Sequence, residues 1–208
     1  MSQRTRPCDN PFNAQRMDAL GYIEFEYVLS EVASRLERHG YRGAICGPHG
    51  CGKTAMLQAL GDQLMEHGLT PLPLFINSDR NQALPADWRR TIRRAKQTDA
   101  LLLDGYDLLP MWARAWVWFA SRRAGAVVVT THREVRFKTL ARPTPSRILL
   151  KQLVEQLAPT LMDEIDTDRL FDQSGGNLRE ALRLAYDQFA AHGVKTPRPA
   201  SGRPTIAA

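Results

Sequence analysis

The octet GPHGCGKT at residues 47–54 carries the clearest chemistry in this chain, and it follows the apolar stretch YRGAIC directly. Its glycines let backbone amides turn inward around an anion, because no side chain blocks the approach. Lys53 brings an ammonium that can reach the β- and γ-phosphates of a nucleoside triphosphate, and Thr54 brings a hydroxyl ligand for Mg²⁺. The pattern G-x-x-x-x-G-K-[ST] is matched without a gap. We therefore expect a phosphate-binding loop made by all eight residues: Gly47, Pro48, His49, Gly50, Cys51, Gly52, Lys53 and Thr54.

The plainer alternative is a glycine turn that joins a strand to a helix and binds nothing. The motif requires a strand before it and a helix after it, and the sequence offers both. GAIC at residues 43–46 is typical of a short buried strand, and Leu57, Leu60 and Leu64 recur at helical spacing. The amino end of that helix would also direct its dipole at the same anion. These flanks favour triphosphate binding over a structural turn.

A carboxylate near the loop is needed to hold the metal through water, and Asp104 is the candidate. It ends the apolar run ALLLD, where the carboxyl end of a neighbouring strand would present it to Thr54. The alternative is an ordinary polar residue that closes a buried strand. The metal assignment, with Thr54 and Asp104 as ligands, is favoured because the phosphate loop is also present.

Hydrolysis further requires a group that orients or deprotonates the attacking water. Many such ATPases place Glu directly after the metal-binding Asp, but this chain has Gly105 there. Asp107 is the nearest acid, and it faces the γ-phosphate if the chain turns at Gly105; otherwise it caps a helix that starts near Pro110. Thr131 and His132, which end the next strand, either bond the water or the γ-phosphate or face solvent.

The elements expected around these residues alternate between strand and helix. Strands are predicted at 43–46, 72–77, 99–107 and 126–133, with a short fifth strand at 147–153 that runs into a helix. Helices are predicted around the apolar residues of 23–36, which lie between Gly21 and His39, and from residue 55 to near His67. Further helices are predicted at 86–97 and 111–123, and two more between Asp163 and His192. Apolar strands that alternate with helices indicate a parallel sheet covered on both faces. The predicted fold class is therefore α/β, a three-layer sheet with a small helical lid at the carboxyl end.

The chain divides by composition into four parts. Residues 1–20 read as an arm on the surface, 21–153 as the nucleotide-binding core, 154–193 as the helical lid and 194–208 as a disordered tail. No window suits a membrane span and the amino terminus lacks a secretory signal. The three cysteines, Cys8, Cys46 and Cys51, show no metal-binding spacing. We expect a cytoplasmic protein without membrane contact.

The net charge of +6 is concentrated in the middle of the chain, where 15 Lys and Arg stand against 6 Asp and Glu between Asp79 and Lys151. The segment DWRRTIRRAKQ would form a helix with a broad cationic face, which either binds the phosphates of a nucleic acid or is an ordinary solvated surface. No aromatic residue interleaves with its cations, and we favour the solvated surface. On the next helix Trp112 and Trp116 share a face, while Trp118 points elsewhere, so one set packs on the sheet and the other meets solvent or a partner.

With these motifs in order, the chain resembles P-loop ATPases of the AAA+ and STAND type over about residues 8–192. GPHGCGKT is similar to Walker A, LLLDGYD to a Walker B of the D-G-x-D form, and VVVTTHR to the sensor-1 strand, with His132 where Asn is common. SGGNLREAL resembles the sensor-2 element, in which Arg179 projects from the lid helix toward the phosphates. NPF at residues 10–12 resembles the entry segment of small bacterial AAA ATPases tied to secretion and transposition, where residues before the loop often pack on the adenine.

The resemblance implies the strand order 5-1-4-3-2, ATP and Mg²⁺ as cofactors, and an assembly in which an arginine of one subunit reaches its neighbour's ATP. No single arginine stands out for that role among Arg133, Arg136, Arg142 and Arg147. The expected activity is a Mg²⁺-dependent ATPase that couples nucleotide state to movement of a lid or partner, with a homo-oligomer or another protein as partner. Its catalytic residues would be Lys53, Asp104, Asp107, His132 and Arg179. The alternative is an ATP-binding switch or scaffold with little turnover that acts on nucleic acid, and the missing Glu favours it.

Overall fold

The computed structural model describes residues 10–23, 28–76, 85–162 and 164–192. Its centre is a sheet of five strands: β1 (Arg42–Cys46), β2 (Thr70–Phe75), β3 (Asp99–Asp104), β4 (Ala126–Thr131) and β5 (Thr139–Ala141). The strand order is β2-β3-β4-β1-β5, and every pair of neighbours in it is parallel. The predicted order is confirmed. Parallel strands place all their carboxyl ends at one edge, so segments far apart in the sequence meet there.

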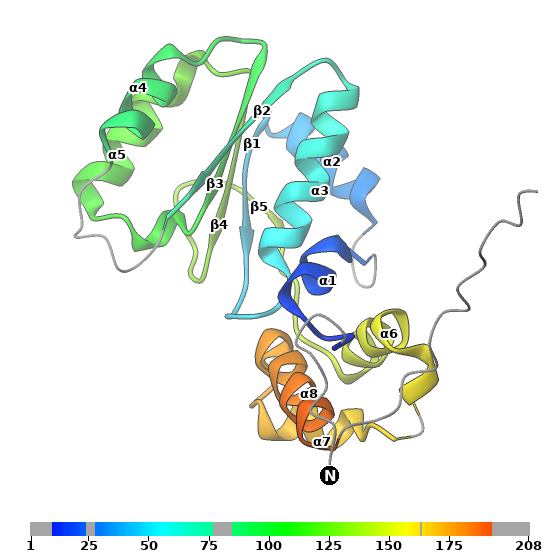
Figure 1. Cartoon of the computed structure of the whole chain (residues 1–208). Coiled ribbons are helices and arrows are strands. Elements are labelled where there is room, and N and C mark those ends of the chain that lie inside the picture. Colours follow the sequence, from blue (N-terminus) through cyan, green and yellow to red (C-terminus); the bar gives the residue numbers. More distant parts are fainter. Residues whose placement is uncertain (1–9, 24–27, 77–84, 163, 193–208) are drawn as a thin grey trace, which may run out of the picture.

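Helices cover both faces of this sheet, as the continuous apolar strands require (Figure 1). Along β3, Ala100 and Leu102 pack on the side of α2 (Leu29–Arg38) and α3 (Lys53–Glu66). Leu101 and Leu103 pack on the side of α4 (Ala86–Arg94) and α5 (Met111–Ala120). The alternation follows from the two-residue period of a strand, and it yields the three-layer α/β fold predicted from the sequence.

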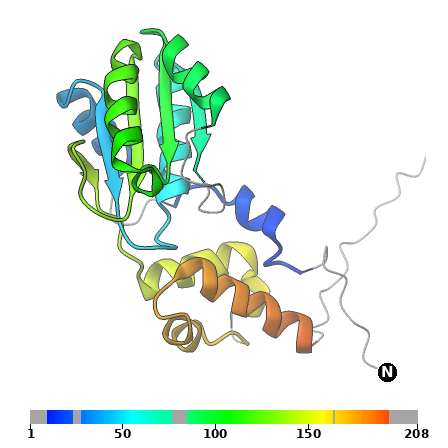
Figure 2. The same ribbon diagram turned by 90° about the vertical axis from the view of Figure 1, so that its left-hand side faces the viewer.

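A separate hydrophobic cluster holds together the helices at the carboxyl end of the chain. We call α6 (Arg147–Leu157), α7 (Thr167–Gln173) and α8 (Leu178–His192) the C-terminal helical cluster. It lies beyond the carboxyl ends of the strands, with α1 (Ala14–Ala19) between it and the sheet (Figure 2). The described residues also form three short 3₁₀ turns: η2 (Tyr106–Leu108), η3 (Ser121–Arg123) and η4 (Pro159–Leu161). The cluster thus faces the edge where a nucleotide site is expected.

The prediction of a fifth strand at 147–153 is wrong. These residues begin α6, because the Ser146 hydroxyl accepts a hydrogen bond from the Leu149 amide at 3.1 Å and caps the helix. Leu150, Val154 and Leu157 are buried along one face of it, at helical spacing. The fifth strand is β5, which spans only three residues and therefore gives no two-residue pattern long enough to recognise.

The expectation of a surface arm at the amino end is also wrong for its described part. Phe12 is fully buried among the residues of the C-terminal helical cluster, and Asn10 donates a hydrogen bond to the Tyr186 carbonyl at 3.0 Å. The NPF segment therefore anchors the start of the chain to α8. Cys8, the predicted tail at 194–208 and part of the predicted helix at 23–36 lie outside the described residues.

The described helices include none that is long and apolar enough to cross a membrane. α5 divides its tryptophans between core and surface: Trp116 and Trp118 pack against the sheet cluster, whereas Trp112 is 62% exposed. The sequence had grouped Trp112 with Trp116 on one face.

Candidate nucleotide site

The octet forms a loop between β1 and α3 at the carboxyl edge of the sheet. Gly50 and Gly52 adopt φ values of 70° and 87°, a region that a side chain disfavours, and they reverse the chain into the helix. The Gly47 amide donates to the Thr131 carbonyl at 3.0 Å and fixes the loop to β4. Among the described residues, the amides of His49, Gly50 and Thr54 find no acceptor. Such a run of unpaired donors at the amino end of a helix suits a phosphate group.

The Lys53 side chain closes this loop from the inside. It is 7% exposed, and its ammonium donates to the carbonyl oxygens of Gly47 at 2.8 Å and Pro48 at 2.5 Å. The Cys51 thiol bonds the same Pro48 carbonyl at 3.1 Å and is buried, which raises its pKa. A buried ammonium beside several free amides is a strong positive field, so the loop favours a polyanion.

Thr54 and Asp104 meet next to the loop, as the sequence predicted. The Thr54 hydroxyl donates to Asp104 Oδ2 at 2.7 Å. The other carboxylate oxygen accepts a hydrogen bond from the Thr130 hydroxyl, which in turn accepts from the Gly105 amide at 2.8 Å. Thr130 therefore fixes the carboxylate that faces the loop. Sequence reasoning singled out Thr131 instead, whose hydroxyl is fully buried and has no partner among the described residues. The two-residue period of β4 contains the signal, because it places Thr130 on the same face as Val128, toward α3.

The residues present fit a triphosphate with Mg²⁺. A hydroxyl and a carboxylate are hard oxygen ligands of the kind that Mg²⁺ prefers, and in such sites the phosphates and water complete the coordination. The described part of the chain holds no group of three or more His, Cys, Asp or Glu that could bind a metal without such help. A metal here would therefore depend on the phosphates for most of its ligands.

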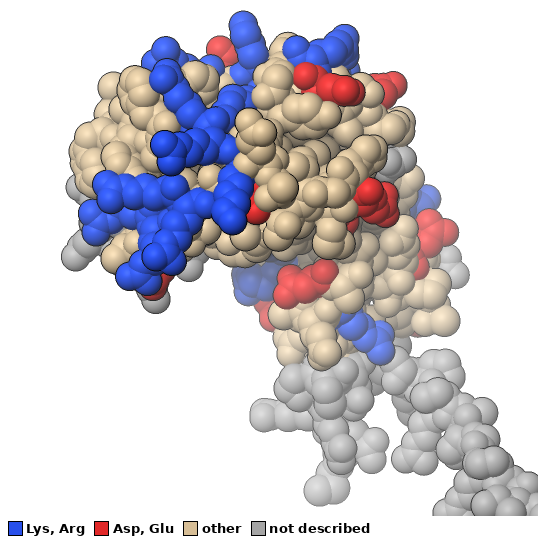
Figure 3. Space-filling view, turned by 90° about the horizontal axis from the view of Figure 1, so that it is seen from above, with Lys and Arg blue, Asp and Glu red and all other residues tan. Residues whose placement is uncertain are grey.

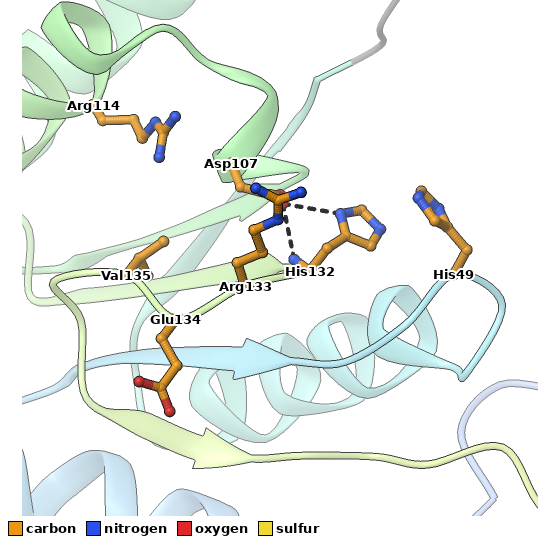
Figure 4. Close-up of a pocket in the computed structure, with 7 residues that line it drawn as sticks. All are labelled: His49, Asp107, Arg114, His132, Arg133, Glu134 and Val135. Carbon is orange, nitrogen blue, oxygen red and sulfur yellow. Dashed lines mark hydrogen bonds and ion pairs between the residues drawn. The ribbon is translucent and has the colours of Figure 1, made fainter.

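Asp107 and His132 form a hydrogen-bonded pair beside the loop. Gly105, with φ of 79°, turns the chain, so that Asp107 faces β4 and does not cap α5, whose first turn has no side-chain cap. Asp107 Oδ2 accepts from the His132 amide at 2.9 Å and lies 3.0 Å from His132 Nδ1 (Figure 4). An ionised Asp107 makes Nδ1 the donor and leaves Nε2 as the acceptor of a neutral ring. Asp107 Oδ1 is buried without a partner among the described residues.

His49 of the loop stacks on His132, with the ring centres 3.8 Å apart. Both rings line a pocket of about 360 Å³ beside the loop (Figure 4). The pocket is lined by two arginines, two histidines, two acids and one valine: Arg114, Arg133, His49, His132, Asp107, Glu134 and Val135. It brings together cations and a histidine–carboxylate pair next to the predicted phosphate loop.

Comparisons with known proteins find a similar fold in solved structures. No family model matches the sequence, and no curated protein matches it. AMPPCP-bound DnaA from Aquifex aeolicus has a similar structure, with a TM-score of 0.52 and 16% identity over 85% of this chain and 64% of its own. A DNA replication initiation factor is also similar, with a TM-score of 0.50 and 15% identity over 83% of this chain and 66% of its own. The chain thus spans just under two thirds of the length of both proteins.

This chain shares the α/β fold of these two structures. The fold class predicted from the sequence is confirmed, and membership of the AAA+ and STAND ATPases is still an expectation from the motifs. The narrower resemblance to secretion- and transposition-associated ATPases stays a prediction, because identity at this level shows the fold alone. The octet follows β1, Asp104 ends β3 and His132 follows β4, which are the places that the predicted Walker A, Walker B and sensor-1 motifs require.

The four arginines that follow β4 differ in their surroundings. Arg133 lines the pocket, whereas Arg136 lies over the Trp118 ring at 4.8 Å. Arg142 pairs with Glu134. Arg147 pairs with Asp172 at 2.5 Å and with Asp168, and these contacts raise its pKa. Arg133 is therefore the one of the four that faces the pocket beside the nucleotide loop.

Asn177, which sequence reasoning missed, is the residue that the segment between α7 and α8 brings to the glycine loop. A Cβ on Gly50 would lie 1.9 Å from Asn177 Oδ1, so the two residues are in direct contact. The same oxygen accepts from the Glu180 amide at 3.2 Å and caps α8. Arg179, predicted to sense the phosphates, is exposed in the first turn of α8. Its role in sensing the phosphates therefore stays a prediction.

Replacing Gly50 with alanine should loosen the contact between the P-loop and α8. The positive φ costs about 1–2 kcal/mol for any side chain, and the new methyl group must also displace Asn177. We expect hydrogen exchange at the first turn of α8 to accelerate. Gly68→Ala is the matched control, because Gly68 also has a positive φ, of 84°, but a Cβ there meets nothing within 4 Å. Equal exchange in α8 of both variants would contradict the contact.

Binding of a triphosphate should be accompanied by proton uptake at His49. The pKa of His49 lies below its ordinary value, mainly because of His132 and further through partial burial and Lys53. A phosphate chain beside the ring favours its charged form and raises that pKa, so affinity should increase as the pH falls from about 8 to 6. Calorimetry in two buffers with different ionisation heats measures the uptake. His49→Gln should reduce it, and unchanged uptake in that variant would exclude His49 as the source.

Proposed function

We propose that this chain is a Mg²⁺-dependent ATPase in which nucleotide state is coupled to movement of the C-terminal helical cluster or of a partner. The observation that carries the proposal is the convergence of four groups at one edge of the sheet: the free amides of the loop, the Lys53 ammonium, the Thr54–Asp104 pair and the Asp107–His132 pair. ATP is proposed as the triphosphate because one structure with the same fold binds AMPPCP.

In this proposal the loop amides and Lys53 bind the β- and γ-phosphates, and Thr54 and Asp104 hold Mg²⁺. The metal neutralises charge that develops on the phosphate oxygens. Lys53 already lies inside the loop at 2.8 Å from the Gly47 carbonyl, so little reorganisation is needed to meet the nucleotide. Thr130 keeps the Asp104 carboxylate oriented through its own hydrogen bond.

His132 would orient and deprotonate the attacking water through Nε2. Asp107 holds Nδ1 at 3.0 Å and stabilises the positive charge that the ring acquires, so the pair takes the place of the Glu that is missing at position 105. This arrangement assigns to Asp107 a positioning role and to His132 the proton transfer.

Coupling to movement is supported by the Gly50–Asn177 contact. A phosphate bound to the amide of Gly50 changes the loop that Asn177 touches, and Asn177 caps α8. We propose that residues 21–153 act as the nucleotide-binding core and 154–193 as the lid. Arg179 would then approach the phosphates only when the lid closes, since it is exposed here. Arg133 is the proposed residue for a neighbouring subunit's ATP in a homo-oligomer, and a cytoplasmic location is proposed with it.

The second candidate is an ATP-binding switch with little turnover, which the absence of Glu at position 105 favours. Two measurements on the full chain separate the possibilities: calorimetric titration with ATP in the presence and absence of Mg²⁺, and release of inorganic phosphate over a series of protein concentrations. We expect Mg²⁺-dependent binding and a turnover that increases with protein concentration if subunits complete each other's sites. Binding of ATP without phosphate release would support the switch. A titration that detects no heat of ATP binding would refute both candidate functions.

A further inference from the structure

Exposed cations gather on a part of the molecule that the nucleotide site does not use. We call this the basic surface. Figure 3 shows Lys and Arg side chains concentrated over the side that carries α4 and α5, at the amino edge of the sheet, with few acidic groups among them. Its members are all exposed and come from α4, the turn after it and η3: Arg89, Arg90, Arg93, Arg94, Lys96, Arg122 and Arg123.

The fold explains why residues about thirty positions apart share this surface. α4 precedes β3 and α5 precedes β4, and each helix runs antiparallel to the strand that follows it. Both helices therefore end at the amino edge, where Lys96 leads into β3 and Arg123 leads into β4. The P-loop lies at the opposite edge, roughly 20 Å away for strands of six residues. The basic surface is thus separate from the nucleotide site.

The charges of this surface are poorly compensated within the chain. Asp87 pairs with Arg90 at 3.4 Å, with both side chains more than half exposed, and Asp99 accepts a hydrogen bond from the Lys96 amide at 2.7 Å. The remaining five arginines of the surface have no ion pair among the described residues. Their field extends to the half-buried Arg42, whose pKa is lowered by burial and by Arg122. Such a field attracts a polyanion.

Aromatic rings of α5 lie among these cations, whereas Trp88 of α4 packs against the sheet core. Arg93 lies over the Trp116 ring at 5.6 Å, and Arg122 lies over the Phe119 ring at 4.7 Å. Phe119 is 58% exposed, so one of its faces is open to a ligand. Guanidinium groups beside open rings suit the phosphates and bases of an unpaired nucleic-acid strand, since bases stack on the rings while the cations follow the backbone.

The opposite end of the molecule has the opposite charge. Residues 154–192 contain 8 Asp and Glu against 3 Lys and Arg. A polyanion is therefore repelled from the C-terminal helical cluster and steered toward the amino edge. An anionic membrane could bind the same cations, but it would not explain why aromatic rings lie beside them.

We propose that the basic surface binds single-stranded nucleic acid, with the arginines of α4 and η3 on the phosphates and Phe119 against a base. Binding is independent of sequence, because phosphate contacts carry no base information. It weakens with salt as counterions return to the strand. This function goes beyond the proposed ATPase activity, and neither depends on the other.

The test uses fluorescence anisotropy of a labelled single-stranded oligonucleotide of mixed sequence over a series of potassium chloride concentrations. The variant Arg89→Gln, Arg94→Gln, Arg123→Gln removes three cations with no ion pair among the described residues. The control Arg16→Gln, Lys151→Gln, Arg169→Gln removes three equally exposed cations away from the surface. We expect roughly tenfold or greater loss of affinity in the first variant and a salt slope smaller by about 2. The control should bind within about twofold of the wild-type protein, since its phosphate contacts are intact.

Three results would overturn the proposal. They are absence of salt-dependent binding by the wild-type protein, equal weakening in the two variants, and tighter binding to vesicles of phosphatidylserine than to the oligonucleotide. Tighter binding of the duplex than of the single strand would refute the role of Phe119. ATP binding and phosphate release of the first variant should equal those of the wild-type protein. A result against nucleic-acid binding is thereby distinguished from a result against ATP binding and hydrolysis.

Discussion

Lys53→Met eliminates ATP-dependent stabilisation and lowers phosphate release at least about 100- to 1,000-fold. The ammonium supplies the buried positive charge that the loop amides cannot replace, and it lies within 2.8 Å of the loop carbonyls. Methionine keeps the length and volume of the buried stem, so the fold of the loop is disturbed as little as possible. The loss of ATP-dependent stabilisation and phosphate release therefore reports the removal of the Lys53 charge and not the creation of a cavity.

The measurement is thermal unfolding with and without Mg²⁺ and ATP, together with phosphate release. A ligand that binds only the folded state raises its melting temperature, so the wild-type protein should shift and Lys53→Met should not. Without nucleotide, the variant should melt close to the wild-type protein. Lys151→Met, at an exposed position of α6, is the control for the loss of one lysine and should retain the shift. An ATP-induced shift of wild-type size in Lys53→Met would refute the assigned role.

His132→Ala should reduce phosphate release by about 100-fold or more while leaving ATP affinity within a few-fold of the wild-type value. The reason is that His132 is assigned to the water and not to the phosphate-binding loop. Asp107→Asn should have the smaller effect, because the amide can keep a contact with the ring but no longer stabilises its positive charge, and it favours the wrong tautomer.

Single-turnover phosphate release on ATP-loaded protein separates these effects from binding. His39→Ala, at an exposed histidine after α2, serves as the control and should react at the wild-type rate. Which of the two variants loses more activity decides which residue is the base. If Asp107→Asn is inactive while His132→Ala is not, Asp107 is itself the base, and undiminished release in both variants would remove the pair from the mechanism.

Much of the fold follows from local patterns in the sequence. The octet predicts its own loop, because three glycines, a lysine and a threonine at fixed spacing determine the backbone path and the donors. The apolar run before Asp104 places its carboxylate at a strand end, and parallel strands bring that end to the loop. The α/β class was correct because the period of each segment is a local property. The strand order came from the resemblance to a known family and not from these periods.

Only the tertiary structure decided which side chains meet around that loop. Asp107 lies 25 residues from His132, and its two possible roles could not be separated until Gly105 was seen to turn toward β4. Asn177 reaches Gly50 from a different helical cluster, and Phe12 is buried there although Asn10 and Asn13 lie close to it in the sequence. The error at residues 147–153 has the same origin: a short apolar run fits a strand or a helix equally well, and the packing of Leu150 against α7 and α8 selects the helix. Such choices depend on contacts between distant segments, which a local pattern does not encode.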